Sequence, residues 1–266
     1  MTVLAQTAPG QHPPVPRWAR RLLGPSLLFG GWIVLALTGV ISEKTLAPPG
    51  EVWSAFTELV SSGKLQHHLW ESLQRVLKGL VFGITIGVTL ALASGFFRIG
   101  EDIIDGSMQI LRGLPVIALV PLFIFWFGIG ETPKVLLISL GVAFPVYINT
   151  FAAIRNVDAR LVESARTFGL GRWQLARHVV LPGALPGFFT GLRFALAVSW
   201  LVLVFAEQIN AVSGLGFLVT NAREFQRTDI QLVALFVYGT LGFGSDCLVR
   251  LLERSALQWR SSFTGT

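Results

Sequence analysis

The sequence predicts an all-α membrane protein with six transmembrane helices and a helical hairpin on the cytoplasmic side. Three observations lead to this fold class. Only 14% of the 266 residues are charged, whereas soluble domains average about 25%. More than half of the residues are apolar, and the mean hydropathy is +0.63. The apolar residues form runs close to the roughly 20 residues that a helix needs to cross the hydrocarbon core of a bilayer.

Six apolar runs follow one another along the chain. The fifth is taken to begin near Pro186, because proline suits the first turn of a helix. Arg193 in the fifth run and Asp246 in the sixth are the charges inside them. The predicted spans are residues 22–41, 79–97, 113–130, 135–154, 186–206 and 230–249.

The net charge of +6 is interpreted as a sign of membrane topology, because Lys and Arg gather in cytoplasmic loops, rather than as a sign of nucleic-acid binding. If the N-terminus is cytoplasmic, fourteen of the 21 Lys and Arg residues fall on the cytoplasmic side, as membrane proteins prefer. We therefore expect both termini in the cytoplasm. Arg75 and Lys78 lie at the outer mouth of the second span, against the rule, and are expected to snorkel or to face a water-filled mouth.

The chain divides into three parts. Residues 1–21 are expected to form a disordered cytoplasmic tail, residues 22–252 the transmembrane domain, and residues 253–266 a second cytoplasmic tail. Within the domain, residues 43–71 form the longest outer segment. There, Pro48-Pro49-Gly50 signals a turn, and a short amphipathic helix follows. Its apolar positions are Val52, Phe56, Leu59 and Val60.

The second span carries a small residue at every fourth position. A stripe of this kind lets another helix approach closely. It predicts either an interface with another subunit or a gate, or tight packing within one bundle. The stripe consists of Gly79, Gly83, Gly87, Ala91 and Gly95.

The third span contains Pro115 and Pro121. Proline removes a helical hydrogen bond and kinks the axis. Broken helices persist in membranes only where protein or water satisfies the freed backbone groups. The prolines therefore predict a kinked helix, which either lines a translocation path or is bent for structural reasons.

The loop between the fourth and fifth spans, residues 157–182, has the pattern of a helical hairpin. Asp158 suits the N-cap of a first helix, and Gly169 and Gly171 suit the turn that follows it. Pro182 is expected to end the second, short helix. The apolar positions are Leu161, Ala165 and Phe168 in the first helix, and Trp173, Ala176 and Val180 in the second.

This loop carries a recognisable spacing. Glu163-Ser164-Ala165 is followed after three residues by Gly169, after nine more by Val179, and then by Leu181-Pro182. The chain thereby resembles the permeases of type I ABC importers, the binding-protein-dependent inner-membrane components, whose signature is E-A-A, three residues, G, nine residues, I, one residue, L-P. Ser164 and Val179 are the departures, both conservative in size.

Four further stretches make the resemblance strongest to the aliphatic sulfonate, taurine and nitrate permeases, and among these to the alkanesulfonate group. They are residues 111–115, 125–129, 144–150 and 221–225. The resemblance implies import of a small anion for sulfur metabolism. Taurine, nitrate or a thiamine precursor are the alternatives on the same machinery.

The resemblance also implies a mechanism and partners. The hairpin would be the coupling helix that docks on a separate ATPase, with Glu163 anchoring it and Gly169 forming its turn. The permease would form a homodimer in the bacterial inner membrane, with two ATPase subunits and an extracytoplasmic substrate-binding protein. ATP and Mg²⁺ would be bound by the ATPase, so this chain is expected to be no enzyme and to hold no cofactor or metal.

Polar residues within spans are the default candidates for a translocation path. The ionised Glu207 would repel an anion, so a structural or gating role is expected for it. Arg112 and Arg193 would either attract an anion or anchor to lipid phosphate. The candidates for the path are Pro115, Pro121, Tyr147, Asn149, Ser199, Trp200 and Glu207.

Two other classes of protein fit the sequence less well. A secondary transporter or channel would not explain the hairpin, and the spans lack the several deep charges such a protein uses. A membrane enzyme would need a motif such as Gly-x-Ser-x-Gly or His-Glu-x-x-His, which the sequence lacks. Nor does it contain a phosphate-binding P-loop, since Gly63-Lys64 is followed by Leu65.

Overall fold

The computed structural model describes residues 17–38 and 45–259, and these residues form helices and connecting turns, with no β-strand among them. The principal helices are α1 (Arg17–Leu37), α2 (Pro49–Ser61), α3 (Lys64–Phe96), α7 (Glu131–Arg155), α10 (Leu181–Asn210), α11 (Leu215–Glu224) and α12 (Thr228–Ala256). Of the tail expected to be disordered, residues 1–16 lie outside the described residues, whereas residues 17–21 form the first turn of α1, so the expectation was wrong for them.

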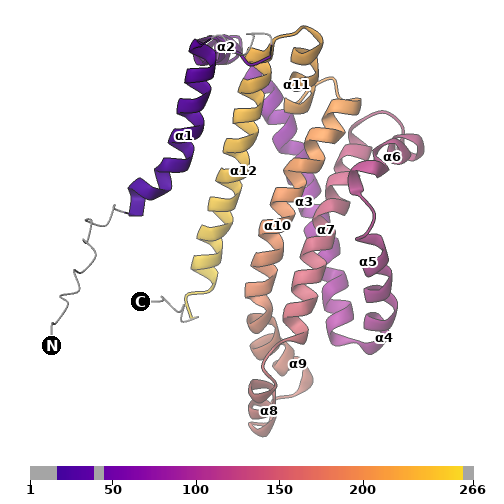
Figure 1. Cartoon of the computed structure of the whole chain (residues 1–266). Coiled ribbons are helices and arrows are strands. Elements are labelled where there is room, and N and C mark those ends of the chain that lie inside the picture. The colour runs from indigo at the N-terminus through magenta and orange to yellow at the C-terminus, as the bar shows by residue number, and fades with distance from the viewer. Residues whose placement is uncertain (1–16, 39–44, 260–266) are drawn as a thin grey trace, which may run out of the picture.

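Helix α7 is the centre of the bundle. It packs against α3 on one side and α10 on the other, and α12 lies beside α10 (Figure 1). Val142 and Val146 of α7 are completely buried, together with Leu203 of α10. Three long helices around these side chains form the core.

The small-residue stripe of α3 explains how closely α3 and α7 approach. A Cβ atom at Gly83 would lie 2.6 Å from the carbonyl oxygen of Ser139, and one at Gly87 would lie 2.7 Å from that of Ala143. Only glycine leaves room for the facing backbone at these positions. The packing interpretation of the stripe is therefore confirmed, because α7 occupies the space that a second subunit would need, while a role of the stripe in a gate stays a prediction.

Among the residues that the structure describes, four helical stretches are long and apolar enough to cross a membrane. They are Lys64–Phe96, Glu131–Arg155, Arg172–Ile209 and Thr228–Ala256. Helix α3 is about 50 Å long at 1.5 Å per residue, so the second span is part of a helix that begins at Lys64 rather than at Gly79. In α1, the described apolar stretch is the shorter Ser26–Ala36. The all-helical membrane class holds, whereas the count of six spans stays a prediction.

The third predicted span is broken rather than kinked. Two helical stretches, Arg98–Leu111 and Val116–Phe127, meet at a bend of 86°. The first contains α4 (Arg98–Gly100), the π-helical η1 (Glu101–Asp105) and α5 (Gly106–Leu111), and the second contains η2 (Val116–Leu119) and α6 (Val120–Phe127). Pro115, in extended backbone, stands at the break, and Pro121 lies in the first turn of α6.

The outer helix α2 agrees with the sequence pattern in all but one position. Pro49 occupies its first turn, and Val52 and Leu59 are buried. Val60 is exposed instead, while Ala55 points inward. The buried face of α2 packs against α12 and α3.

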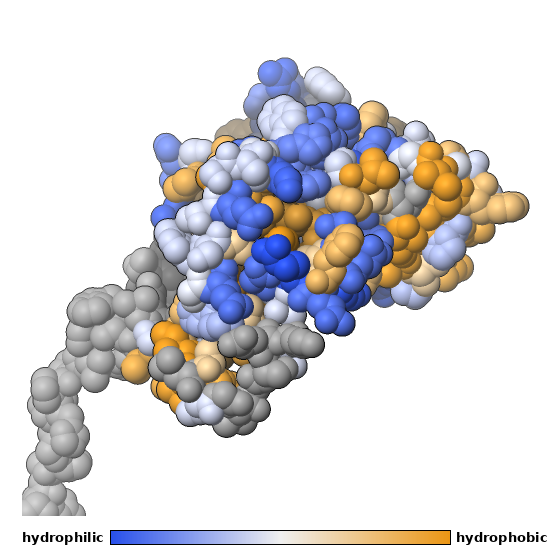
Figure 2. Space-filling model, turned by 90° about the horizontal axis from the view of Figure 1, so that it is seen from above, coloured by the Kyte–Doolittle hydropathy of each residue, from blue (hydrophilic) through white to orange (hydrophobic). Residues whose placement is uncertain are grey.

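The two ends of the bundle differ in character. Helices α2 and α11 lie at one end, and the hairpin helices α8 (Ala159–Thr167) and α9 (Arg172–Leu175) lie at the other, toward which α12 runs (Figure 1). Hydrophilic residues cover much of the end that carries α11, and apolar residues gather toward one side of it (Figure 2). Exposed apolar residues of the α6 region include Phe125, Trp126 and Ile129.

Candidate functional site

The hairpin at residues 157–182 is held by the caps that its sequence specifies. The Asp158 carboxylate accepts a hydrogen bond of 2.9 Å from the backbone N–H of Arg160 and so caps α8. At the other end, the N–H of Gly169 donates to the Arg166 carbonyl (2.9 Å), and that of Leu170 to the Ala165 carbonyl (3.2 Å). These two bonds form a Schellman motif, which needs a left-handed residue at its turn.

Gly169 supplies that left-handed residue. Its φ is +81°, and no atom lies within 4 Å of the position that a Cβ would take. A side chain at Gly169 would strain the backbone, because of the positive φ, but it would not clash with any other part of this chain. Gly171, with φ −68°, is in ordinary extended backbone as the N-cap of α9.

The second helix of the hairpin does not end at Pro182, as the sequence had indicated. After α9, the π-helical η3 (Ala176–Val180) leads directly into α10, so one helical run extends from Arg172 to Ile209. The N–H of Leu181 donates to the carbonyl five residues back, on Ala176. The widened turn before Pro182 moves aside the carbonyls that its ring would otherwise strike.

The surface of the hairpin includes three large exposed apolar side chains. Leu161, Phe168 and Trp173 are 59%, 84% and 76% exposed, whereas Ala165 is buried. The Glu163 side chain has no hydrogen bond or ion pair to any described residue and borders a cavity of about 490 Å³ under the ends of α3 and α7. Ser164 is exposed, and Val179 and Pro182 are half-buried at the base, beside the exposed Leu181. The residues of the signature thus lie together at the end of the bundle.

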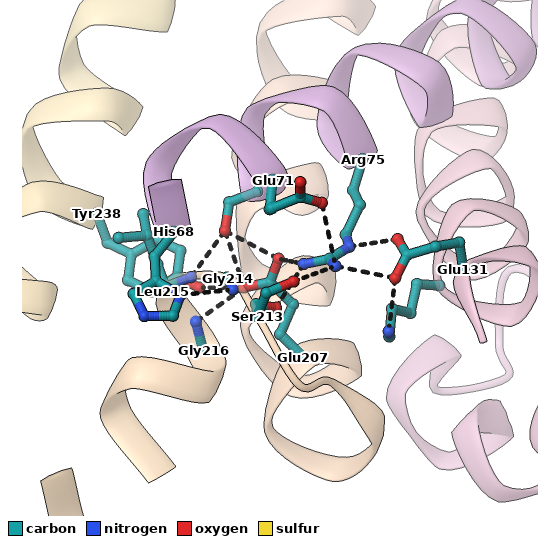
Figure 3. Close-up of polar contacts among 12 residues, drawn as sticks. His68, Glu71, Arg75, Glu131, Glu207, Ser213, Gly214, Leu215, Gly216 and Tyr238 are labelled. Carbon is teal, nitrogen blue, oxygen red and sulfur yellow. Dashed lines mark hydrogen bonds and ion pairs between the residues drawn. The ribbon is translucent and has the colours of Figure 1, made fainter. Parts of the chain in front are cut away.

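At the opposite end, Glu207 is the centre of a buried polar network (Figure 3). Its carboxylate accepts hydrogen bonds from the Ser72 hydroxyl (2.8 and 2.9 Å), the Gly216 N–H (2.8 Å) and the Tyr238 hydroxyl (3.3 Å). It also forms an ion pair of 2.6 Å with Arg75. Only 1% of Glu207 is exposed.

Arg75 joins Glu207 to the start of α7. Its Nε and Nη2 donate to the two carboxylate oxygens of Glu131 (2.5 and 2.9 Å), and its Nη1 donates to Glu207 and to the Ser213 carbonyl. Lys134 pairs with Glu131 at 3.0 Å. Arg75 is 2% exposed, so it neither snorkels nor faces a water-filled mouth, contrary to the sequence-based expectation.

The network fixes the connection between α10 and α11. The N–H of Leu215 donates to the Ser72 hydroxyl (2.8 Å), and that of Gly214 to Nδ1 of His68 (3.1 Å). Because buried polar groups need partners, this arrangement satisfies a carboxylate, a guanidinium and three loop N–H groups together. It supports the structural role expected for Glu207 by attaching α3, α7 and α11 to one end of α10.

The other candidates for the translocation path differ in their surroundings, and only Tyr147 and Trp200 form hydrogen bonds to other helices among the described residues. The Tyr147 hydroxyl contacts the Ser94 hydroxyl and the Asp105 carboxylate, each at 3.2 Å, and Asn149 donates to the Pro145 carbonyl at 2.8 Å. The Ser199 hydroxyl donates to a carbonyl of its own helix (2.7 Å) and Trp200 to the Ser245 hydroxyl (3.1 Å). Pro115 and Pro121 are exposed at the broken span. A shared path through these residues stays a prediction.

Sequence reasoning missed two pairings. It noted Arg75 as an anomaly but did not connect it to Glu207 or Glu131. It noted Arg193 and Asp246 separately, and they form an ion pair of 3.0 Å between α10 and α12. Single charges of opposite sign in two otherwise apolar spans were the available signal, because such charges in membranes pair with one another.

An all-helical bundle with several apolar spans and a protruding two-helix hairpin at one end is consistent with a membrane subunit of a transporter. The chain belongs to the family of binding-protein-dependent transport system inner membrane components, whose model matches residues 83–258. It is therefore the membrane-spanning permease subunit of an ABC importer.

The relatives are similar over almost their whole length. The chain is 45% identical to the putative aliphatic sulfonates transport permease protein SsuC of Escherichia coli, covering 94% of this chain and 96% of the relative. It is 41% identical to the SsuC of Bacillus subtilis, covering 93% and 90%. The taurine transport system permease protein TauC of E. coli is 35% identical, covering 88% and 87%.

Solved structures share the fold at lower sequence identity. A chain of an amino acid ABC transporter superposes with a TM-score of 0.61 at 18% identity, covering 75% of this chain and 95% of that one. A chain of the MetNI methionine ABC transporter gives 0.56 at 20% identity, covering 73% and 98%. At these identities the likeness concerns the fold alone.

Proposed function

We propose that this permease imports aliphatic sulfonates across the bacterial inner membrane. The observation that carries the proposal is the 41% and 45% identity, over more than nine-tenths of the chain, to relatives from two different bacteria whose names specify aliphatic sulfonates. The identity to the taurine permease is lower, at 35%. Taurine is itself a small sulfonate, so it is the first alternative substrate, ahead of nitrate or a thiamine precursor.

The energy would come from a separate ATPase that binds ATP and Mg²⁺ and docks on the hairpin. The exposed Leu161, Phe168 and Trp173 suit burial in a groove of another protein, because apolar side chains favour leaving water. The Glu163 carboxylate, without a partner in the described chain, is available to a donor on that protein. Rocking of rigid helix units would then alternate access between the two sides of the membrane.

One chain supplies one hairpin, whereas an ATPase dimer offers two grooves, so we propose a homodimer of this permease. A substrate-binding protein would deliver the sulfonate at the end that carries α2 and α11. Both termini would be cytoplasmic. The bias of Lys and Arg supports this orientation, as does the course of α12, which runs from the end that carries α11 toward the hairpin end of the bundle (Figure 1).

Deletion of the gene and growth on single sulfur sources test the substrate. The deletion strain should fail to grow on alkanesulfonates as the only sulfur source, should grow on sulfate, and should recover when the gene is restored. Normal growth on every alkanesulfonate, in a strain without a second sulfonate importer, would refute the sulfonate assignment. Loss of growth on taurine alone would assign the permease to taurine.

A further inference from the structure

Three charged side chains form a cluster where α10 faces α12. Asp246 accepts a hydrogen bond of 3.0 Å from Nε of Arg193 on one carboxylate oxygen, and one of 2.7 Å from Nε of Arg250 on the other. Two guanidinium groups therefore share one carboxylate, and the cluster carries a net charge of +1. A purely structural pair between the helices would need only one arginine.

The donors of Arg193 are only partly used. Its Nε–H bonds to Asp246, and its two terminal nitrogens donate no hydrogen bond to any described residue. The side chains of Arg193 and Asp246 are 36% and 34% exposed, so the free edge of the guanidinium is accessible. A guanidinium with two open N–H groups matches a pair of oxygens on an anion.

The accessible edge opens into a cavity of about 340 Å³ with two kinds of wall. Arg193, Asp246 and Thr190 supply polar atoms, and Phe194 and Ala197 supply apolar surface. A small anion with a short apolar tail combines the two chemistries that this cavity offers.

Arg193 lies inside the apolar part of α10, whereas Asp246 and Arg250 lie 10 and 6 residues before the end of α12 at Ala256. Arg193 is 12 residues from the start of α10 and 17 from its end at Asn210, about 18 and 26 Å along the helix. An arginine within a membrane span is costly, and such residues mark ion or substrate pathways by default. Two arginines for one aspartate make a surplus cation that interhelical pairing alone does not explain.

We propose that Arg193 binds the sulfonate group of the substrate as it crosses the membrane, while Phe194 and Ala197 contact its alkyl chain. The proposal rests on the proposed function, since it names a binding residue for that substrate. Asp246 holds the guanidinium in place through Nε, and Arg250 offsets the aspartate charge so that the anion is not repelled. Arg193 thus acts as an intermediate contact between the outer and inner openings.

A phospholipid phosphate has the same anionic chemistry and is the other possible source of the ligand. Lipid phosphates lie at the membrane surface, and an arginine near a helix end reaches them by snorkelling. The depth of Arg193 favours an anion that travels through the protein. The lipid composition of the test membrane distinguishes the two sources.

The test uses the complete transporter, with permease, ATPase and binding protein, reconstituted in vesicles. ATP-driven uptake of radiolabelled ethanesulfonate is measured at saturating concentrations of the loaded binding protein for Arg193→Gln, Arg193→Lys and the double variant Arg193→Gln/Asp246→Asn. Arg254→Gln, one turn beyond Arg250 on α12, is the matched control. Thermal unfolding of each variant reports whether the fold is intact.

Arg193→Gln should lower the uptake rate about tenfold, as expected for loss of a charge-assisted contact, with Arg193→Lys intermediate and Arg254→Gln unchanged. The double variant removes the unpaired aspartate and should regain thermal stability, but its uptake should stay low. Recovery of uptake in the double variant would overturn the proposal, because it would show that only the pairing matters.

Two further outcomes are informative. The effect of Arg193→Gln should be the same in zwitterionic vesicles and in vesicles with anionic phospholipid, and an effect confined to the latter would assign the site to lipid instead. Absence of uptake by the wild-type transporter would refute the proposed function and the site with it. Normal wild-type uptake that Arg193→Gln leaves unchanged would refute the site alone.

Discussion

The network around Glu207 predicts an asymmetry between two substitutions that cut the same cluster. Arg75→Gln leaves the Glu207 carboxylate buried, at 1% exposure, without its cationic partner. Removing one partner of a buried pair costs about 3–5 kcal/mol. Glu131→Gln also removes an ion pair to Arg75, but the Glu131 side chain is 55% exposed, and exposed pairs contribute only about 0–1 kcal/mol.

Thermal unfolding of the purified permease in detergent measures the difference. Arg75→Gln should lower the melting temperature by roughly 10 °C, given about 2–4 °C per kcal/mol for a chain of this size. Glu131→Gln should lower it by less than about 4 °C on the same scale. The double variant Arg75→Gln/Glu207→Gln leaves no fully buried charge unpaired, since Glu71, the other partner of Arg75, is 32% exposed, and it should be more stable than Arg75→Gln alone. Equal destabilisation by the two single variants, or no recovery in the double, would refute this reasoning.

Three further predictions concern the hairpin, the core and the topology. Gly169→Asn, which tolerates the left-handed backbone at φ +81°, should keep most transport, whereas Gly169→Trp should abolish it with membrane insertion intact. Gly171→Ala is the control, and equal loss in Gly169→Asn and Gly169→Trp would mean that bulk at the docking surface is irrelevant. Gly83→Ala should destabilise the bundle by about 1–3 kcal/mol through overpacking against the Ser139 carbonyl. Gly244→Ala, where a Cβ meets open space on α12, should be neutral or stabilising in the same unfolding assay. A reporter protein that is active only in the cytoplasm should be active when it is fused to the C-terminus. Activity of a reporter that works only in the periplasm would contradict the assigned orientation.

The hairpin shows what the sequence specifies locally. Asp158 and Gly169 cap α8 through bonds to residues only a few positions away, so their types and spacing predict the geometry. Pro182 was misread because the rule that proline ends a helix holds for regular α-helix. The π turn at residues 176–180 changes the hydrogen-bond pattern just before it, and no residue type in that segment announces such a turn.

Pairings between side chains on distant helices could not be predicted from the sequence. Arg75 and Glu207 are 132 positions apart, and each charge by itself has several readings until the packing of α3 against α10 is known. The glycine stripe likewise predicts a close approach but does not name the partner helix. In contrast, the apolar runs did predict the fold class. Backbone N–H and C=O groups in lipid must bond to one another, and a helix satisfies all of them within one segment.

The central claim is that this chain forms the sulfonate pathway of an ATP-driven importer. Vesicles that contain the permease with its ATPase and binding protein test it most directly, by uptake of radiolabelled ethanesulfonate with and without ATP. Uptake that requires ATP, the binding protein and an intact Gly169 turn is the predicted result. Uptake that proceeds without ATP, or none for any alkanesulfonate while another anion is transported, would contradict the account.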